Sequence, residues 1–159
     1  MTDDDLRPGE TTVAAAAPDD ARLRFVGQIR TPFATRDACP RQGDPDGPEC
    51  RIEVDAPWDA ALDGVEAFAR LEVLYWLDRA RRDLVRQSPR ADGTTRGTFA
   101  LRSPMRPNPI GSAIVTLVRR DGAVLVVRGL DCLDGTPLLD IKPHRGDPAV
   151  RRRAEGRDT

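Results

Sequence analysis

Three prolines within six residues constrain the fold of this chain more than any other feature of its sequence. Each proline fixes its own φ and pushes the preceding residue out of the helical region. The prolines are Pro104, Pro107 and Pro109. We therefore predict that residues 102–111 form an extended, stiff loop. This loop presents three planar side chains that suit an anion or a nucleic-acid base, namely Arg102, Arg106 and Asn108.

A second loop, around residues 130–137, is rich in carboxylates. Gly135 can adopt a positive φ, and we expect Pro137 to block the hydrogen-bond ladder. Such a turn offers free amides together with the carboxylates of Asp131, Asp134 and Asp140. An acidic turn that only joins two strands is the alternative, because Asp-Gly pairs are common in hairpins.

Short runs of apolar or alternating residues predict β-strands along most of the chain. These runs are residues 23–29, 51–54, 68–77, 98–101, 110–119, 123–130 and 138–141. The runs at 110–119 and 123–130 are expected to pair as a hairpin, a helical turn is expected at 57–62, and a helix is the rival for 68–77. About six or seven short strands with little helix favour a mainly β fold, a small closed or nearly closed barrel, over a βαβ fold.

The length of 159 residues indicates one domain. Composition predicts a disordered arm at 1–21, a barrel domain at 22–145 and a flexible basic tail at 146–159. Lysine plus arginine (25) nearly balance aspartate plus glutamate (26), so a nucleic-acid partner would need a local basic patch. Three cysteines without metal-ligand spacing, and no secretory or membrane-spanning segment, predict a cytoplasmic protein.

Several segments together resemble the TsaA-like (TrmO) family. They are Phe99–Pro104, Arg106–Gly111, Asp134–Pro137 and Asp140–Pro143. The resemblance implies a small β-barrel enzyme that uses S-adenosylmethionine to methylate N6 of a threonylcarbamoyl-adenosine beside the anticodon of tRNA. It also implies a homodimer with its active site near the interface, to which residues 73–77 and Trp58 are candidate contributors.

The resemblance and the residue types together suggest roles for individual side chains. Cofactor-binding residues would be Pro40, Arg41, Gln42, Asp78, Arg79, Arg102, Asp134, Gly135, Thr136 and Pro137. Asp78 and Arg79 stand where tRNA-modifying members carry a His-Gln pair, a departure that bears on the substrate more than on the cofactor. Arg102 and Asp134 are the candidate catalytic residues, expected to hold the polar ends of the cofactor, because methyl transfer from a sulfonium depends mainly on positioning. A carboxylate or a backbone carbonyl would serve as the proton acceptor.

Substrate contacts would come from a basic cluster and from the residues near the two loops. The candidates are Arg81, Arg82, Arg106, Asn108 and Lys142. For the cluster around Arg81 and Arg82, a solvated face with internal aspartate pairing is the alternative to phosphate contacts.

Other nucleotide and metal sites lack their sequence signatures. No glycine-rich fingerprint follows the first predicted strand and no P-loop motif occurs, which disfavours both classes of nucleotide site. His144 is the single histidine, so neither a metal cluster nor a Ser-His-acid triad is indicated. Two alternatives to tRNA methylation stay open: methylation of a small molecule, and a non-catalytic sensor of S-adenosylmethionine.

Overall fold

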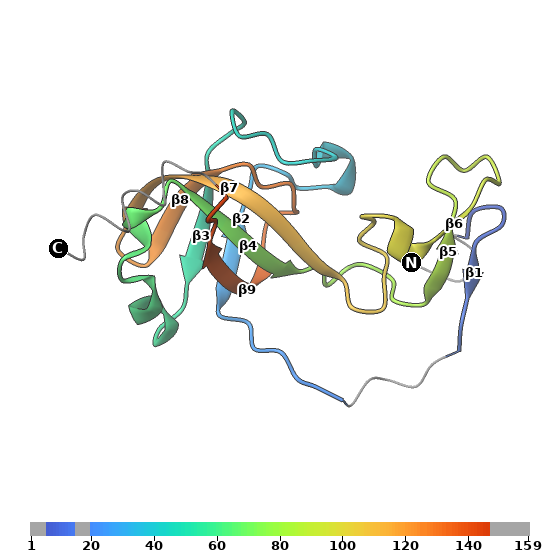
Figure 1. Cartoon of the computed structure of the whole chain (residues 1–159), viewed down its shortest axis with the longest axis horizontal. Helices are drawn as coiled ribbons and strands as arrows, with labels where there is room; N and C mark the ends of the chain where they lie inside the picture. The colour runs from blue at the N-terminus through green and yellow to red at the C-terminus, as the bar shows by residue number, and fades with distance from the viewer. Residues whose placement is uncertain (1–5, 15–19, 147–159) are drawn as a thin grey trace. The chain divides into compact units, whose positions relative to one another are not determined.

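The computed structural model describes residues 6–14 and 20–146, and its framework is a closed β-barrel (Figure 1). The described strands are β1 (Thr11–Thr12), β2 (Gly27–Arg30), β3 (Cys50–Val54), β4 (Arg70–Trp76), β5 (Leu84–Gln87), β6 (Arg96–Gly97), β7 (Ile110–Asp121), β8 (Val124–Arg128) and β9 (Thr136–Pro143). Short 3-10 helices lie between them: η2 (Arg36–Ala38), η3 (Trp58–Leu62), η4 (Val65–Ala67) and η5 (Thr98–Ala100). The barrel closes in the order β2-β3-β8-β7-β4-β9. The mainly β barrel predicted from the sequence is therefore confirmed.

Side-chain alternation along the strands fills the barrel interior. In β4 every second residue is buried, so that Leu71 and Val73 have no exposed surface and Tyr75 is 3% exposed. Ile29 of β2 and Ile52 of β3 are likewise fully buried. Burial of each large aliphatic side chain stabilises the fold by about 1.5–3 kcal/mol. The same alternation explains why Arg70–Trp76, within the run 68–77, form a strand rather than the rival helix.

The strand β2 begins later than the sequence pattern predicts. Leu23 and Phe25 are 55% and 50% exposed, and the first residue paired with β3 is Gly27. A Cβ at position 27 would lie 2.0 Å from the carbonyl oxygen of Glu53. The two strands therefore meet at a point where their backbones approach more closely than any side chain allows.

The prediction that residues 98–101 enter the barrel is wrong. Thr98–Ala100 form η5, outside the barrel, and the Thr98 hydroxyl donates a hydrogen bond to the Leu84 carbonyl at 2.7 Å. A run of four residues is too short to distinguish a strand from a 3-10 turn by periodicity. By contrast, the hairpin of β7 and β8 is confirmed, with Asp121 opposite Val124.

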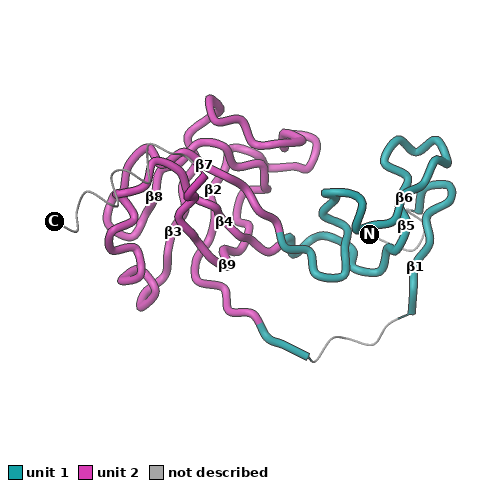
Figure 2. Tube along the Cα trace, in the orientation of Figure 1, with its two compact units in different colours: residues 1–22, 77–110 teal, residues 23–76, 111–159 magenta. Residues whose placement is uncertain are grey.

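Two compact units make up the chain, and each is considered by itself (Figure 2). The barrel unit comprises residues 23–76 and 111–159. The insertion unit comprises residues 1–22 and 77–110 and contains the three-stranded sheet β1-β5-β6. Strand β1, which pairs with β5, lies within the segment expected to be a disordered arm. The boundaries of arm, barrel domain and tail stay predictions, and residues 147–159 of the tail lie outside the described residues.

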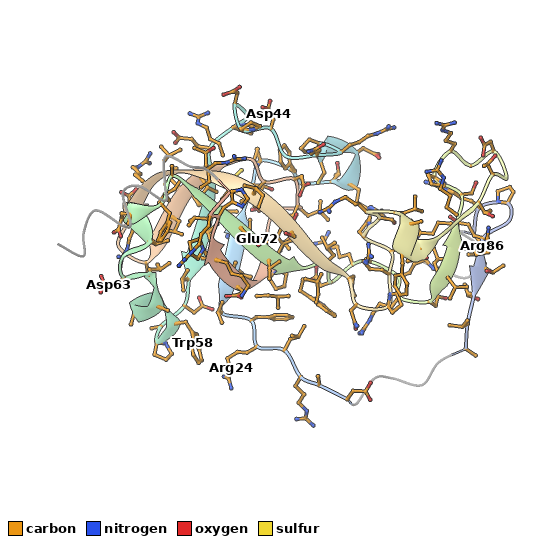
Figure 3. The ribbon with its side chains drawn as sticks, in the orientation of Figure 1. Arg24, Asp44, Trp58, Asp63, Glu72 and Arg86 are labelled. Carbon is orange, nitrogen blue, oxygen red and sulfur yellow. The ribbon has the colours of Figure 1, made fainter. Side chains whose placement is uncertain are left out.

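The connections that leave the barrel are longest at one end. β2, β4 and β8 run in the same direction, because antiparallel partners separate them. Their carboxyl ends therefore meet at one end, here called the loop end, from which residues 31–49, 77–109 and 129–135 depart. Away from the loop end, the Arg24 guanidinium, before β2, lies over the ring of Trp58 in η3, 5.4 Å from its centroid (Figure 3). Among the described residues no helix has the length and apolar character needed to cross a membrane.

Candidate functional site

The turn that contains Asp134 holds two loops of the loop end together. Its carboxylate accepts a hydrogen bond from the Thr31 amide at 3.2 Å, and its own amide donates to the Phe33 carbonyl at 2.9 Å. Gly135 has a φ of +79°, the positive value expected for this position, and donates to the Ile29 carbonyl at 2.8 Å. Arg30 Nη1 lies 3.9 Å from Asp134 Oδ2. Asp134 is thus first a structural clamp, although its side chain is 46% exposed and open to a ligand.

Thr136 and Pro137 continue this turn directly into β9. The Thr136 hydroxyl donates to the Leu133 carbonyl at 2.7 Å, and the residue is 4% exposed. Pro137 lies opposite Gln28 inside the ladder. The strand therefore begins at Thr136 and continues past Pro137, where a block had been expected. The turn is rigid, and the amides of residues 134–136 are already bonded within the protein.

The loop that carries Pro40, Arg41 and Gln42 is anchored by a backbone contact. A Cβ at Gly43 would lie 1.8 Å from the carbonyl oxygen of Gly129, which itself has a φ of +109°. Arg41 and Gln42 are exposed and Pro40 is partly buried. The loop is therefore fixed at its base while its polar side chains are available to a ligand.

A hydrogen-bonded pair that the sequence did not single out, with one buried and one partly buried member, lies at the same end of the barrel. The Tyr75 hydroxyl donates to Asp131 Oδ1 at 2.5 Å. The Tyr75 ring covers Gly111, where an added Cβ would lie 2.1 Å from the ring carbon Cε2. Asp131 was noted as one of several acids in a turn, but its partner is 56 residues away in sequence, and nothing local announces the contact.

The negative charge of Asp131 contributes to the raised pKa values of two nearby cysteine thiols. Burial, and then the negative charge of Asp131, raise the pKa of the Cys39 thiol. Burial raises the pKa of Cys132 to about 12, with Asp131 a smaller contribution in the same direction. Asp131 therefore lies near Cys39, the residue that directly precedes the Pro40–Gln42 loop, and it precedes the Asp134 turn by three residues.

In the insertion unit, a buried glutamine ties the proline-rich loop to its neighbours. Gln87 is 3% exposed, and its Nε2 donates to the Thr98 hydroxyl at 3.0 Å and to the Met105 carbonyl at 2.6 Å. Because an unpaired buried amide is costly, these bonds fix the position of the loop. The stiffness expected from the prolines is thus reinforced by a side chain from β5.

Two predicted substrate residues also support this loop. Arg106 Nη1 donates to the carbonyls of Leu101 and Ser103 at 3.1 and 3.2 Å. Arg82 Nε donates to the Pro107 carbonyl at 2.7 Å, and its Nη2 lies 3.3 Å from Asn108 Oδ1. Arg102, in contrast, is exposed. The same contacts that shape the loop therefore engage Arg82, Arg106 and Asn108.

The remaining predicted residues differ in how strongly they are held. Arg81 pairs with Asp83 through two hydrogen bonds of 2.7 and 2.9 Å, which lower the pKa of that carboxyl. Lys142 pairs with Asp140 at 2.6 Å, and this hydrogen bond raises the lysine pKa. Asp78 and Arg79 are exposed. Among the described residues no cluster of three or more His, Cys, Asp or Glu side chains could hold a metal ion.

Residues 28–147 match the family described as the tRNA-methyltransferase O N-terminal domain. This chain belongs to that family. The resemblance to the TrmO family inferred from the sequence is thereby confirmed.

Several named relatives and a solved structure support the same assignment. A protein of Rhizobium radiobacter described as "Probable S-adenosyl-L-methionine-binding protein VirR" is 57% identical over 140 residues, which are 88% of this chain and 80% of VirR. The tRNA (adenine(37)-N6)-methyltransferase of Escherichia coli K12 is 38% identical over 131 residues, 75% of this chain and 55% of that enzyme. A crystal structure of TrmO from Pseudomonas aeruginosa superposes with a TM-score of 0.66 at 32% identity, covering 84% of this chain and 60% of that one. The chain therefore spans little more than half the length of these two methyltransferases.

The polar groups of the loop end fit the cofactor named for these relatives. S-adenosylmethionine carries a sulfonium and an ammonium, which suit carboxylates, and a carboxylate, which suits a guanidinium. The barrel unit supplies both kinds of group on loops that leave this end, with Asp131 and Asp134 in the loop after β8 and the exposed Arg41 and Gln42 in the loop after β2. When bound, the cofactor supplies a methyl group on a good leaving group.

Proposed function

We propose that this chain is an S-adenosylmethionine-dependent methyltransferase that methylates N6 of threonylcarbamoyl-adenosine beside the anticodon of tRNA. Family membership supports the methyltransferase assignment. The observation that carries the RNA substrate is the distribution of charge. Residues 77–110 contain eight arginines and three aspartates, whereas the whole chain has a net charge of −1. The segment 77–110 thus supplies the local basic patch that a polyanion needs.

Part of this charge is available for contacts with phosphates. Four arginines are exposed and form no side-chain hydrogen bond or ion pair within the described residues: Arg79, Arg90, Arg96 and Arg102. Phe99 lies in the same unit and is 82% exposed. An exposed aromatic ring among arginines suits the stacking of unpaired bases, which are what a tRNA loop presents.

The barrel unit would hold the methyl donor. We assign Pro40, Arg41 and Gln42 and the turn from Asp134 to Pro137 to cofactor binding, with Arg102, Asp78 and Arg79 as further contacts. Lys142, Asn108 and the arginines at 81, 82 and 106 remain candidates on the substrate side. Holding the acceptor nitrogen in line with the methyl group supplies most of the catalysis in such a reaction.

A second candidate function is cofactor binding without transfer to RNA. It is favoured by the names of relatives, since VirR, the 57% identical protein, is described only as binding S-adenosyl-L-methionine. A small-molecule acceptor belongs to the same alternative.

We further propose a cytoplasmic homodimer, in keeping with a tRNA substrate and with the family. Of the residues considered for the interface, Val73 and Tyr75 face the barrel interior, whereas Trp58 is 40% exposed beside Arg24. Sedimentation equilibrium would test the assembly. A monomer that binds the cofactor at full affinity would contradict an active site shared between subunits.

The experiment that tests the function uses methyl-labelled S-adenosylmethionine. The purified protein is incubated with threonylcarbamoylated tRNA, with the same tRNA lacking that modification, and with a pool of small metabolites. We expect label in N6-methyl-threonylcarbamoyl-adenosine, identified by nucleoside mass spectrometry. Label in the metabolite pool alone, or cofactor binding without any transfer, would replace the proposal with the second candidate.

A further inference from the structure

Tyr75 and Asp131 form a hydrogen-bonded pair that joins the end of β4 to the loop after β8. Tyr75 is 3% exposed, and its hydroxyl is 2.5 Å from Asp131 Oδ1. Its ring is locked over Gly111, where no side chain could fit. A fixed, buried donor therefore determines where the Asp131 carboxylate points.

Asp131 differs from Asp134 in the use of its oxygens. The Oδ1 atom of Asp134 accepts a hydrogen bond from the Thr31 amide, and its Oδ2 faces Arg30, so both of its oxygens already have a partner within the protein. Asp131 receives only the Tyr75 hydroxyl among the hydrogen bonds of the described residues, so its Oδ2 is left to a ligand. The surroundings also differ, since Asp131 is partly buried and Asp134 is exposed.

The place of Asp131 suits a group that acts at the reacting centre. It lies in the loop after β8, three residues before the Asp134 turn, and close enough to Cys39 to affect that thiol. Cys39 directly precedes the Pro40–Gln42 loop. Asp131 therefore lies near both barrel-unit segments assigned to the cofactor.

We propose that Asp131 is the proton acceptor for the nitrogen that becomes methylated and that Tyr75 is its positioning residue. This assignment rests on the proposed methyl transfer. It gives the acid-base role, for which the sequence identifies no residue, to a side chain with a free oxygen and a fixed orientation.

The step balances with S-adenosylmethionine as the only co-reactant. The nitrogen lone pair forms the new N–C bond while the C–S bond breaks, and the electron pair of that bond stays on sulfur. The positive charge passes to the nitrogen, whose proton is transferred to Asp131 Oδ2. The products are a neutral methylated nitrogen and a protonated carboxyl group, which returns its proton to water.

The test compares Asp131→Asn and Tyr75→Phe with Asp63→Asn, a change of the same kind at an exposed position far from the loop end. Single-turnover methylation of threonylcarbamoylated tRNA should fall about 100-fold or more in Asp131→Asn. In Tyr75→Phe it should fall roughly 10-fold to 100-fold, because the carboxylate loses its orientation. Calorimetric affinity for S-adenosylmethionine should stay within about threefold of wild type in all three variants, and Asp63→Asn should keep full activity.

A spectroscopic measurement shows whether the pair exists apart from activity. Tyr75 is the only tyrosine of the chain, so the tyrosine signal in an ultraviolet resonance Raman difference spectrum between wild type and Asp131→Asn, recorded apart from the tryptophan bands, reports on this side chain. We expect a shift of the band in Asp131→Asn and none in Asp63→Asn. Absence of a shift would overturn the positioning role of Tyr75.

The remaining outcomes separate this assignment from the proposed function. An Asp131→Asn protein as active as wild type, or one that loses cofactor affinity as much as rate, would overturn the proton-acceptor role while leaving the methyltransferase intact. A wild-type protein that binds the cofactor and methylates no acceptor would overturn both. Recovery of part of the rate in Asp131→Glu would support a role for the carboxylate itself.

Discussion

Gly43 lies directly against the carbonyl oxygen of Gly129, at a distance that leaves no room for a side chain. The Cβ of an alanine at position 43 would be 1.8 Å from that oxygen, and the obstacle is backbone rather than a movable side chain. Gly43 follows the segment assigned to the cofactor. The contact therefore sets the position of the Pro40–Gln42 loop.

From this contact we expect Gly43→Ala to displace the loop and to weaken S-adenosylmethionine binding by roughly 10-fold or more, since overpacking costs about 1–3 kcal/mol. Calorimetry with the purified variant measures the affinity. Gly97→Ala is the control, because nothing lies within 4 Å of an added Cβ there and its φ of −60° suits alanine. Equal affinity in a folded Gly43→Ala protein would contradict the assignment of this loop.

Replacement of Gln87 should loosen the proline-rich loop without unfolding the barrel. In Gln87→Leu the Met105 carbonyl and the Thr98 hydroxyl lose their common donor, at a cost of about 1–3 kcal/mol for groups left unsatisfied. Amide hydrogen exchange should speed up in residues 98–109 and stay unchanged in β3 and β8. Faster exchange throughout the barrel would show instead that the two units unfold together.

The barrel could be predicted from the sequence because its strands and turns are marked by patterns of neighbouring residues. Alternation in β3 and the Gly122 turn between β7 and β8 are local features, and both predicted elements are confirmed. The insertion unit has few buried apolar residues, among them Leu84, so no periodic pattern marks it as separate. The sequence therefore offers no reason to separate residues 98–101 from the barrel strands, although Thr98–Ala100 form η5.

The site was predictable where it depends on short motifs and not where it depends on distant contacts. The loops around Pro40 and Asp134 are recognisable from adjacent residues, and their roles stay predictions. The Tyr75–Asp131 pair joins positions 56 residues apart, and the support that Arg106 gives to its own loop depends on backbone carbonyls. Neither contact leaves a pattern in a single sequence.

Alkaline pH should destabilise the barrel through Cys132. An unfolded cysteine loses its proton near pH 9, whereas burial in the folded protein raises the pKa of Cys132 to about 12. Between these values the folded state holds a proton that the unfolded state has lost, so the free energy of unfolding falls as pH rises, by up to about 1.4 kcal/mol per pH unit. Below pH 9 this dependence is absent.

Urea denaturation at several pH values between 8 and 11, compared with Cys132→Ala, isolates this contribution. The variant should lose most of the slope, whereas Cys39→Ala, whose pKa is raised less, should keep it. Identical slopes in wild type and Cys132→Ala would mean that another group governs alkaline unfolding, with the buried Cys50 thiol the next candidate.

The affinity for tRNA should depend on salt concentration through exposed arginines that form no side-chain hydrogen bond or ion pair within the described residues. With a few neutralised phosphates, the log-log slope should be roughly −2 to −4. Joint replacement of Arg90 and Arg96 by alanine should reduce its magnitude by about 1–2, as both are exposed. Filter binding at several salt concentrations measures the slope.

The control for that measurement is Arg119→Ala on the barrel, where the arginine pairs with Asp121 and Glu49. It should leave the slope unchanged. Joint replacement of Arg81 and Arg82 is less informative, because Arg82 also holds the Pro107 carbonyl and its loss would disturb the loop. An unchanged slope in the variant lacking Arg90 and Arg96 would show that these two arginines do not contact phosphates.

Phe99 should contribute to RNA binding through its ring rather than through charge. The Phe99 side chain is 82% exposed, so it makes few packing contacts within its own unit. Phe99→Ala should therefore leave the free energy of unfolding and the affinity for S-adenosylmethionine unchanged. Loss of one base stack should weaken tRNA binding by about 1–3 kcal/mol without altering the salt slope, because stacking releases no counterions. Val85→Ala, at a site 39% exposed in the same unit, is the matched control. If Phe99→Ala instead leaves tRNA affinity intact and shifts the sedimentation equilibrium toward monomer, the ring contacts a second copy of the chain and the stacking role fails.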